Sequence, residues 1–237
     1  MKSWQEDLLS VTNCEDDEHI VFANIEAAAR SLGFDHCAYG LRVPLPISSP
    51  KTIILNNYCA AWQERYASQN YLQIDPTVSY GRRSQTPLVW SDEVFAPTPV
   101  LWDEAQSYGL KVGWSQSSLD AVGVGGMLTL SRARQPLSSA ELSTQEVKMR
   151  WLVNIAHLTL SRIFTSKLRE QAPPTLTERE REVLRWTADG KTSSEVSDIL
   201  LVSENTVNFH VKNAVAKLQT ANKTAAVVRA AMLGLLN

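Results

Sequence analysis

The sequence predicts an α+β protein with two domains, an N-terminal α/β/α sandwich at residues 1–169 and a C-terminal four-helix, helix-turn-helix domain at residues 176–237. Three observations support this. The chain has 237 residues and 44% hydrophobic content, enough for one large and one small core. Strand-like segments alternate with helical ones only in the first part. Between the two parts, residues 170–175 contain paired prolines and form a semi-stiff linker.

The N-terminal part contains helices and strands in alternation. Hydrophobic spacing predicts helices at residues 3–11, 16–32, 60–70, 75–83 and 99–108, and strands at residues 36–41, 52–56, 113–119 and 127–132. Asp75 before Pro76 is a typical helix start. The glycine-rich turn before residue 127 lacks the lysine of a phosphate-binding loop and precedes a strand, so we expect a hairpin. Helices flanking a sheet of four or five strands give the sandwich.

A long helix is expected at residues 138–169, opened by Ser138 with Glu141. Its apolar residues cover more of the helix perimeter than packing on one sheet face requires. One interpretation is a helix packed only on its own domain. The sharper interpretation is that one side packs inward and the other meets a second copy of the chain, which predicts a homodimer.

The C-terminal part reads as four helices, each beginning with a side chain that can accept hydrogen bonds from the first turn. These starting residues are Thr177, Thr192, Ser203 and Asn222. Glu180 and Glu195 complete capping boxes with the two threonines, and Gly190 suits the left-handed position that closes a helix. The two central helices and their tight turn describe a helix-turn-helix. Helical spacing predicts the inward-facing residues Val183, Leu184, Val196, Ile199, Leu200, Val207, Val211 (or His210), Ala214, Leu218, Ala225, Val228 and Met232.

The third of these helices has a polar outer face that suits the major groove of DNA. Asparagine can bond adenine bidentately, and lysine can reach guanine or phosphate. The alternative is an ordinary solvated helix face. From Leu176 onward there are 8 Lys+Arg against 7 Asp+Glu, a formal charge of only +1, so affinity should depend on a local basic face and on dimerisation. The candidate DNA-binding residues are Thr192, Ser203, Glu204, Asn205, Thr206, Asn208, Lys212, Asn213 and Lys217.

Residues 176–192 read LTEREREVLRWTADGKT, and ENTVNFH follows at residues 204–210. This segment resembles the GerE/LuxR-type DNA-binding domain, whose hallmark positions match Glu180, Leu184 and Gly190. The resemblance implies DNA binding, at a palindromic promoter element if the protein is a dimer, and RNA polymerase is then a further candidate partner.

Aromatic residues crowd into a short stretch of the N-terminal part. Tyr58, Trp62, Tyr66, Asp75 and Trp90 lie within 33 residues, and the first three are spaced four apart along a helix and its entry. By composition alone, such a stripe is more often core than a binding site. The segments AAW, ERY, YLQIDPTV and PLVW, however, resemble the autoinducer-binding domain of LuxR-type quorum-sensing receptors, an α/β/α sandwich that holds an N-acyl-homoserine lactone. The matching hallmark positions are Trp62, Tyr66, Asp75, Pro76, Trp90 and Gly113.

The resemblance implies a role for each candidate ligand-binding residue. The indole of Trp62 would donate to the ring carbonyl, and ionised Asp75 would accept the amide N–H. Tyr58 would donate to the amide carbonyl, and Thr129 would donate to the same carbonyl or to a 3-oxo group. Because an empty pocket would leave Asp75 without its partner, ligand should stabilise the fold. The remaining candidates pack the ring, the pocket wall or an acyl chain of roughly eight or more carbons: Tyr66, Trp90, Trp102, Leu110, Gly113, Thr77, Val78, Ala38 and Gly40.

Three other functions are alternatives to a lactone-binding transcriptional regulator. A lactone-modifying enzyme would need a nucleophile or metal, but the histidines show no zinc spacing and no G-x-S-x-G occurs. His36 and Cys37 are adjacent, so on a strand they point to opposite faces. A phosphorylation-driven response regulator would need an acidic pair near its start, a phosphoacceptor aspartate after a third strand and a later lysine. The pair Asp16-Asp17 is present but does not follow a strand, and we find no match for the other two. A receptor that acts chiefly through mixed dimers with other LuxR-type receptors stays open.

The totals point to a cytoplasmic protein without a metal or cofactor. The net charge is −2, and Cys14, Cys37 and Cys59 form neither metal spacing nor an even disulfide framework. The acidic start lacks the apolar core of a signal peptide. No apolar run approaches about 18 residues, so we expect no membrane span.

Overall fold

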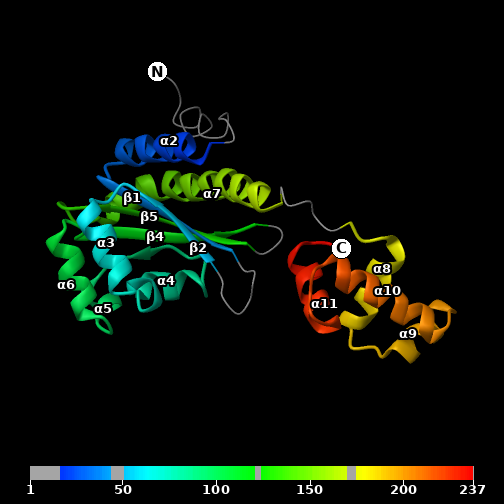
Figure 1. Cartoon of the computed structure of the whole chain (residues 1–237). Helices are drawn as coiled ribbons and strands as arrows, with labels where there is room; N and C mark the ends of the chain where they lie inside the picture. Colours follow the sequence, from blue (N-terminus) through cyan, green and yellow to red (C-terminus); the bar gives the residue numbers. More distant parts are fainter. Residues whose placement is uncertain (1–16, 44–50, 121–123, 170–174, 237) are drawn as a thin grey trace, which may run out of the picture. The chain divides into compact units, whose positions relative to one another are not determined.

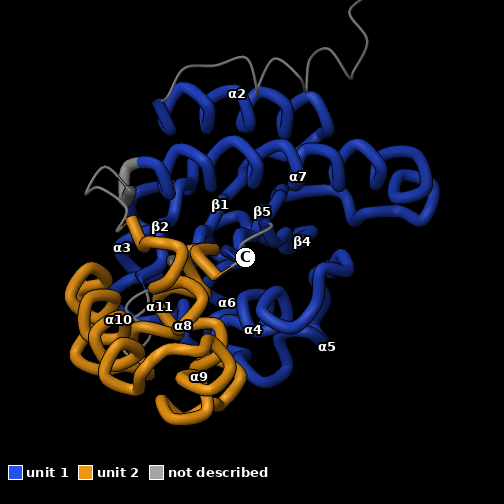
Figure 2. The backbone as a smooth tube through the Cα atoms, turned by 90° about the vertical axis from the view of Figure 1, so that its right-hand side faces the viewer, with its two compact units in different colours: residues 1–167 blue, residues 168–237 orange. Residues whose placement is uncertain are grey.

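The computed structural model describes residues 17–43, 51–120, 124–169 and 175–236. The chain forms two compact units, Met1–Lys167 and Leu168–Asn237 (Figure 2). The helix expected at residues 3–11 lies outside the described residues.

The N-terminal unit is built on one antiparallel sheet of five strands. The order across the sheet is β2-β1-β5-β4-β3. The strands are β1 (His36–Val43), β2 (Lys51–Asn56), β3 (Leu88–Val89), β4 (Val112–Leu119) and β5 (Gly125–Arg132). β4 and β5 pair as the expected antiparallel hairpin. The short edge strand β3 was not predicted, since two residues are too few to show an alternating pattern.

Helices cover both faces of the sheet, which confirms the α/β/α sandwich. α2 (Glu18–Ser31) and α7 (Ser139–Arg169) lie on one face (Figure 1). Their inner sides form the main core with β1, β4 and β5, and this core includes Ile25, Tyr39, Leu128 and Leu160. The other face carries α3 (Ala60–Ser68), the 3-10 helix η1 (Tyr71–Gln73), α4 (Pro76–Gly81), α5 (Asp92–Phe95) and α6 (Pro99–Ser107).

The outward side of α7 remains partly apolar. Val147, Trp151 and Leu158 are exposed, the last with 66% of its surface accessible. Residues four and seven apart share one side of a helix, so these three form a stripe opposite the buried face. The extra apolar perimeter read from the sequence therefore lies at the surface of this unit.

The C-terminal unit contains the four expected helices, α8 (Glu178–Ala188), α9 (Ser193–Leu200), α10 (Glu204–Lys217) and α11 (Lys223–Met232). Both predicted capping boxes are present, and Ser203 and Asn222 cap α10 and α11. Gly190 has φ +85°, as a left-handed helix end requires.

Two inward-facing predictions for this unit were wrong. Ile199 is exposed, because α9 is short and buries fully only Val196. In α11 the fully buried residues are Ala226 and Ala230, whereas Ala225, Val228 and Met232 are only partly buried. The sequence of α11 is rich in alanine, so its two sides differ little in hydrophobicity. The spacing of its apolar residues therefore does not show which side faces the core.

In the described ranges, no helix combines the length and the apolar character that crossing a bilayer requires.

Candidate ligand pocket and nucleic-acid interface

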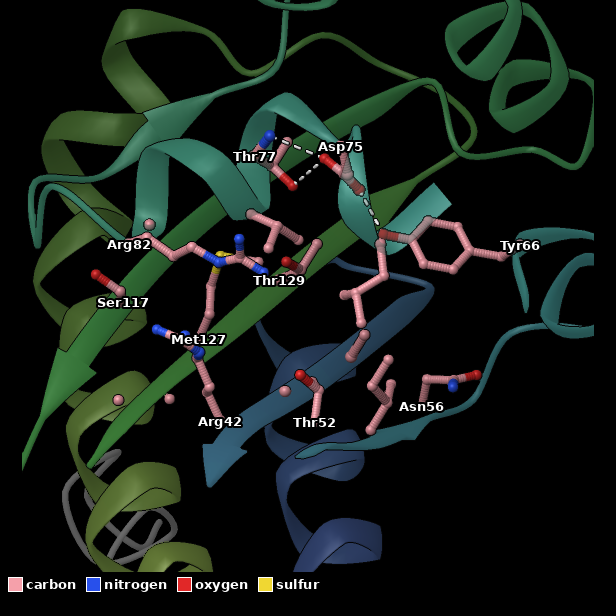
Figure 3. Close-up of a pocket in the computed structure, with 18 of the residues that line it drawn as sticks. Arg42, Thr52, Asn56, Tyr66, Asp75, Thr77, Arg82, Ser117, Met127 and Thr129 are labelled. Carbon is pink, nitrogen blue, oxygen red and sulfur yellow. Dashed lines mark hydrogen bonds between the residues drawn. The ribbon is translucent and has the colours of Figure 1, made fainter. Parts of the chain in front are cut away.

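A pocket of about 860 Å³ lies in the N-terminal unit between the sheet and the helices of its second face (Figure 3). Its volume falls within the range of small-molecule sites. Apolar residues from α3, α4 and α6 form its walls, and side chains from four strands form its floor. Eleven of the thirteen predicted ligand-binding residues line it: Ala38, Gly40, Tyr58, Trp62, Tyr66, Asp75, Thr77, Val78, Trp90, Leu110 and Thr129.

The floor of the pocket is arranged in three rows across β2, β1, β5 and β4, because residues paired directly across strands share one face of a sheet. We name them from the sheet register. The head row is Asn56, Ala38, Thr129 and Ser115. The middle row is Ile54, Gly40, Met127 and Ser117. The distal row is Thr52, Arg42, Gly125 and Leu119. The intervening residues of β1 point into the core on the other face.

Asp75 forms the acidic point of the pocket and is already held by the protein. Its Oδ1 accepts hydrogen bonds from the backbone N–H (2.8 Å) and hydroxyl (2.6 Å) of Thr77. Its Oδ2 accepts from the Tyr66 hydroxyl at 2.9 Å. The first of these bonds caps α4. The expectation that an empty pocket leaves Asp75 unpartnered was therefore wrong, since three donors satisfy it and fix its orientation.

Two phenols and an indole surround this carboxylate. Burial, followed by the nearby charge of Asp75, raises the pKa of Tyr66 far above its ordinary value, and burial likewise raises that of Tyr58. Both hydroxyls therefore stay protonated and can donate. The Trp62 side chain is 3% exposed, and its indole N–H makes no hydrogen bond within the described part of the chain. It can donate into the pocket.

A chain of hydrogen bonds leads from Trp90 to Thr129. The indole of Trp90 donates to the Ser115 hydroxyl (3.0 Å), which lies 3.0 Å from the Thr129 hydroxyl. Ser115 is buried and already accepts from the indole, so donation of its own proton to Thr129 satisfies both of its hydrogen-bonding roles. Thr129 then has its proton free to donate at the head row.

Two predicted ligand-binding residues do not line the pocket. Trp102 donates its indole N–H to Asp92 (2.7 Å) and stacks on Phe95 with ring centroids 4.3 Å apart, so it supports the wall from behind. Gly113 lies under the Trp90 ring, where a Cβ would be 2.1 Å from Cδ2 of Trp90. Its role is to give this indole room.

The structure also adds pocket residues that the sequence reading missed. Phe95, Leu101 and Ala105 contribute apolar wall from α5 and α6. Arg42 and Arg82 bring positive charge to the pocket. The alternation of β1 places Arg42 on the same face as Ala38 and Gly40, which could have identified it from the sequence.

A polar cluster behind Trp62 joins α3 to α6. Arg65 donates to Glu104 through Nε (2.8 Å) and Nη2 (2.6 Å), and the Tyr71 hydroxyl donates to the same carboxylate (2.8 Å). Hydrogen bonds from Arg65 and Tyr71 lower the pKa of Glu104 to about 2. Since the Tyr71 ring lies 6.1 Å from that of Trp62, this cluster helps to fix the indole.

The proposed nucleophiles of the enzyme alternative are inert. Cys37 is fully buried, and burial raises the pKa of its thiol to about 12. His36 lies on the opposite face of β1, as alternation predicts.

In the C-terminal unit, the predicted DNA-facing residues gather on α9 and α10. Asn205, Asn208 and Lys212 are exposed on α10, with Glu204 at its start and partly buried Asn213 farther along. The Ser193 hydroxyl donates to Oδ1 of Asn208 (2.8 Å), which holds this side chain against α9. The hydroxyls of Thr192, Ser203 and Thr206 take part in helix-cap hydrogen bonds.

Two residues of α10 differ from expectation. Lys217 was expected on the free outer face, but its ammonium lies 2.8 Å from a carboxylate oxygen of Glu180 on α8. Glu180 is 3% exposed, so this pair holds α10 to α8 and Lys217 is engaged within the unit. Phe209 was not predicted, yet 60% of its surface is exposed beside Asn205 and Asn208 on the helix.

The N-terminal and C-terminal parts of the chain match two different family models. Residues 17–160 match the model described as autoinducer binding domain, and residues 174–230 match that of bacterial regulatory proteins, luxR family. The transcriptional activator protein AnoR of Acinetobacter nosocomialis is 48% identical over 238 residues, with 100% of both chains covered. The quorum-sensing regulator RhlR of Pseudomonas aeruginosa is 40% identical, covering 98% of this chain and 96% of RhlR.

Solved structures agree with these matches. The crystal structure of Escherichia coli SdiA has a TM-score of 0.83 at 36% identity, covering 99% of this chain and 98% of SdiA. SdiA in complex with octanoyl-rac-glycerol has the same TM-score at 35% identity, covering 100% and 99%. The family consists of transcriptional regulators, which excludes the lactone-modifying enzyme. The chain therefore belongs to the LuxR family and is a quorum-sensing transcriptional regulator with an autoinducer-binding domain and a helix-turn-helix DNA-binding domain.

Proposed function

We propose that the autoinducer is an N-acyl-homoserine lactone whose polar head binds at the head row. One observation carries this proposal: an oriented carboxylate, Asp75, shares the pocket with the donors Trp62, Tyr58 and Thr129. The lactone offers two carbonyl acceptors and one amide donor, which this set complements. Trp62 would donate to the ring carbonyl, and Asp75 would accept the amide N–H with its remaining lone pair.

The test is ligand-dependent stability. Full-length protein is melted with acyl-homoserine lactones of increasing chain length and with the ring-opened acyl-homoserine of each. A lactone that binds the folded state raises the melting temperature with concentration. Octanoyl-glycerol, which SdiA binds, is included as a rival ligand. Stabilisation by octanoyl-glycerol alone, with no lactone effective, would refute a lactone autoinducer.

We further propose that the protein acts in the cytoplasm as a homodimer joined through the outward stripe of α7, formed by Val147, Trp151 and Leu158. Exposed apolar side chains on one side of a helix suit a two-fold contact with the same helix of a second copy. Leu158→Glu should give monomers in sedimentation, whereas the exposed polar change Arg162→Gln on the same helix should leave dimers intact. Dimers that persist in Leu158→Glu would place the interface elsewhere, and monomeric wild-type protein would favour the mixed-dimer alternative.

For the DNA contact, we propose that α10 enters the major groove of each half of a palindromic site, with half-site centres about 34 Å apart. Asn205 and Asn208 would read base edges, Lys212 would contact phosphate or guanine, and exposed Phe209 would pack on a thymine methyl group. Asn208→Ala should weaken DNA binding and leave the lactone-dependent melting shift unchanged. Loss of both would show that the variant has a general folding defect.

A further inference from the structure

The distal end of the pocket is positively charged. Arg42 projects from the end of β1, and Arg82 follows the last residue of α4. Figure 3 shows both side chains extending into the pocket near Met127. Across the part of the chain that the structure describes, neither guanidinium has a hydrogen bond or an ion pair, although both line the pocket.

Within the described residues, neither arginine has a carboxylate partner. Asp75 is the one carboxylate among the described lining residues, and Tyr66 and Thr77 already hold it at the start of α4, whereas Arg82 follows the end of that helix. The connection at residues 44–50 (PLPISSP) contains no acidic residue in its sequence. Asp120, which follows β4, accepts the backbone N–H of Val124 (2.8 Å), and its charge acts on Tyr39 and His157 on the other face of the sheet. Arg83 also lines the pocket, but its Nε donates to the backbone carbonyl of Ser79 (3.2 Å). The like charges of Arg42 and Arg82 repel each other, and an anion bound between them would attract both.

Two serine hydroxyls of β4 that line the pocket are already used. The Ser117 hydroxyl donates to the backbone carbonyl of Ser84 (2.5 Å), and the Ser118 hydroxyl donates to Asn154 (3.2 Å). The donors left for a ligand at this end are therefore the Thr52 hydroxyl of the distal row and the guanidinium N–H groups, of which only the guanidinium groups are charged. They are exposed to solvent, so water hydrates them when the pocket is empty.

The sheet register gives the distance along β1 from the head row to Arg42 in the distal row. Ala38 in the head row and Arg42 in the distal row are four residues apart on β1, which corresponds to about 13 Å along the strand. A zigzag alkyl chain with bonds of about 1.5 Å advances roughly 1.25 Å per bond, so about ten carbons span this distance. Gly40 in the middle row carries no side chain to block the path, and the space where its Cβ would lie has no atom within 4 Å.

We propose that this pocket is built for an acyl-homoserine lactone whose chain of about ten carbons ends in a carboxylate, which pairs with Arg42 and Arg82. The planar guanidinium fork binds carboxylates bidentately, and the pairing is charge-assisted. This inference rests on the proposed lactone function, because the lactone head fixes the end from which the chain is measured.

The test compares three synthetic ligands that share the lactone head: decanoyl-homoserine lactone, 9-carboxynonanoyl-homoserine lactone, and the methyl ester of the latter. Binding to full-length protein is measured by calorimetry. The acid should bind at least tenfold tighter than its ester, and the preference should shrink as salt is raised. In Arg42→Met with Arg82→Met, this preference should disappear while affinity for the decanoyl compound changes less than threefold. Arg134→Met, an exposed arginine outside the pocket lining, is the matched control.

Each outcome has a defined meaning. Equal binding of acid and ester to the wild-type protein, or a preference that survives in the double variant, would overturn the anionic terminus while decanoyl binding keeps the lactone function. Failure of all three ligands would overturn the lactone function, and this inference with it. The single variants Arg42→Met and Arg82→Met, each with an intermediate preference, protect the result against misfolding of the double variant.

Discussion

The indole of Trp90 lies directly against Gly113, so close that a Cβ added there would be 2.1 Å from Cδ2 of the ring. The two residues are also joined through the backbone, where Trp90 N–H donates to the Gly113 carbonyl at 2.8 Å. The edge strand β3 and the pocket wall thus depend on the absence of a side chain at one position of β4.

Gly113→Ala should therefore force the Trp90 ring out of place and break its hydrogen bond to Ser115. Overpacking of this kind costs about 1–3 kcal/mol of unfolding free energy. Denaturant unfolding measures the loss, and the ligand-dependent melting shift should fall with it. Gly40→Ala is the control for stability, since its added methyl meets no atom within 4 Å. Wild-type stability in Gly113→Ala would contradict the packing argument.

Asp75 both caps α4 and, in the proposed function, accepts the ligand amide. Asp75→Ala should lose both roles, with a cap contribution of about 0.5–2 kcal/mol. Asp75→Asn should keep most of the cap, because asparagine is an equally good N-cap, but it lacks the charge for a charge-assisted bond. We expect near wild-type melting of the empty Asp75→Asn protein and a strongly reduced lactone shift. A normal shift in both variants would remove Asp75 from the binding site.

The pair between Glu180 and Lys217 should make the C-terminal unit sensitive to acid. Burial acts to raise the pKa of Glu180, but hydrogen bonds from Lys217 and Thr177 outweigh it and hold the pKa below its ordinary value. A lowered folded-state pKa stabilises the unit above the unfolded value of about 4.3, and this contribution is lost as pH falls through the lowered value. Glu180→Gln should cost about 1–3 kcal/mol at neutral pH.

Hydrogen exchange of the α8 and α10 amides in the full chain measures this local stability. The difference between wild type and Glu180→Gln should be constant above pH 5 and shrink progressively below about pH 4.5. A difference that does not change with pH would assign the loss to packing instead of charge.

Leu201 is strained as well as exposed. It ends α9 with φ 54° and has 90% of its surface accessible. A left-handed conformation costs a non-glycine residue roughly 1–2 kcal/mol. Glycine avoids this cost, but its greater freedom in the unfolded chain offsets part of the gain in stability. Leu201→Gly should slow exchange of the α9 amides by stabilising this turn by about 0.5–1 kcal/mol. Leu201→Ala keeps the strain and should change little; equal stabilisation by both would point to removal of the exposed leucine as the cause.

The two lysines of α10 should differ in their contribution to DNA binding. Lys212 is exposed and able to reach phosphate, so Lys212→Met should reduce the salt dependence of DNA affinity by about one counterion per subunit. Lys217→Met should leave that slope unchanged, because its ammonium is engaged by Glu180. Band shifts over a salt series decide this, with circular dichroism to confirm that each variant is folded. Equal slopes for the two variants would contradict the difference.

Local signals explain why much of the fold could be predicted. Thr177, Thr192, Ser203 and Asn222 cap their helices as expected, since a cap is a hydrogen bond within a few residues of sequence. The five-stranded order and the strand β3 depend on pairing with distant residues, so only the pattern-rich strands were found. Ile199 was misplaced because apolar spacing cannot show that a two-turn helix buries only one side chain fully.

For the site, the sequence indicated which side chains could bind a ligand, but it did not indicate where they lie in the fold. Tyr58, Trp62, Asp75 and Thr129 meet at one pocket because α3 with its entry, the start of α4 and β5 converge there, which their separation in sequence does not reveal. The bond from Tyr66 to Asp75 and the placement of Gly113 under Trp90 depend on how separate segments pack, which the sequence does not show. The charge at the distal end was missed because arginines are usually taken as solvated surface residues.

Because the three floor rows are set by the pairing of the strands, the ligand length that the pocket accepts depends on the strand register. A one-residue insertion in β1 would exchange Ala38, Gly40 and Arg42 for the large core side chains on the other face, destroying pocket and core together. A change in the ligand length that the pocket accepts should therefore come from substitutions at the floor positions, with the register kept. Successive floor positions on one strand are two residues, or roughly 6–7 Å, apart.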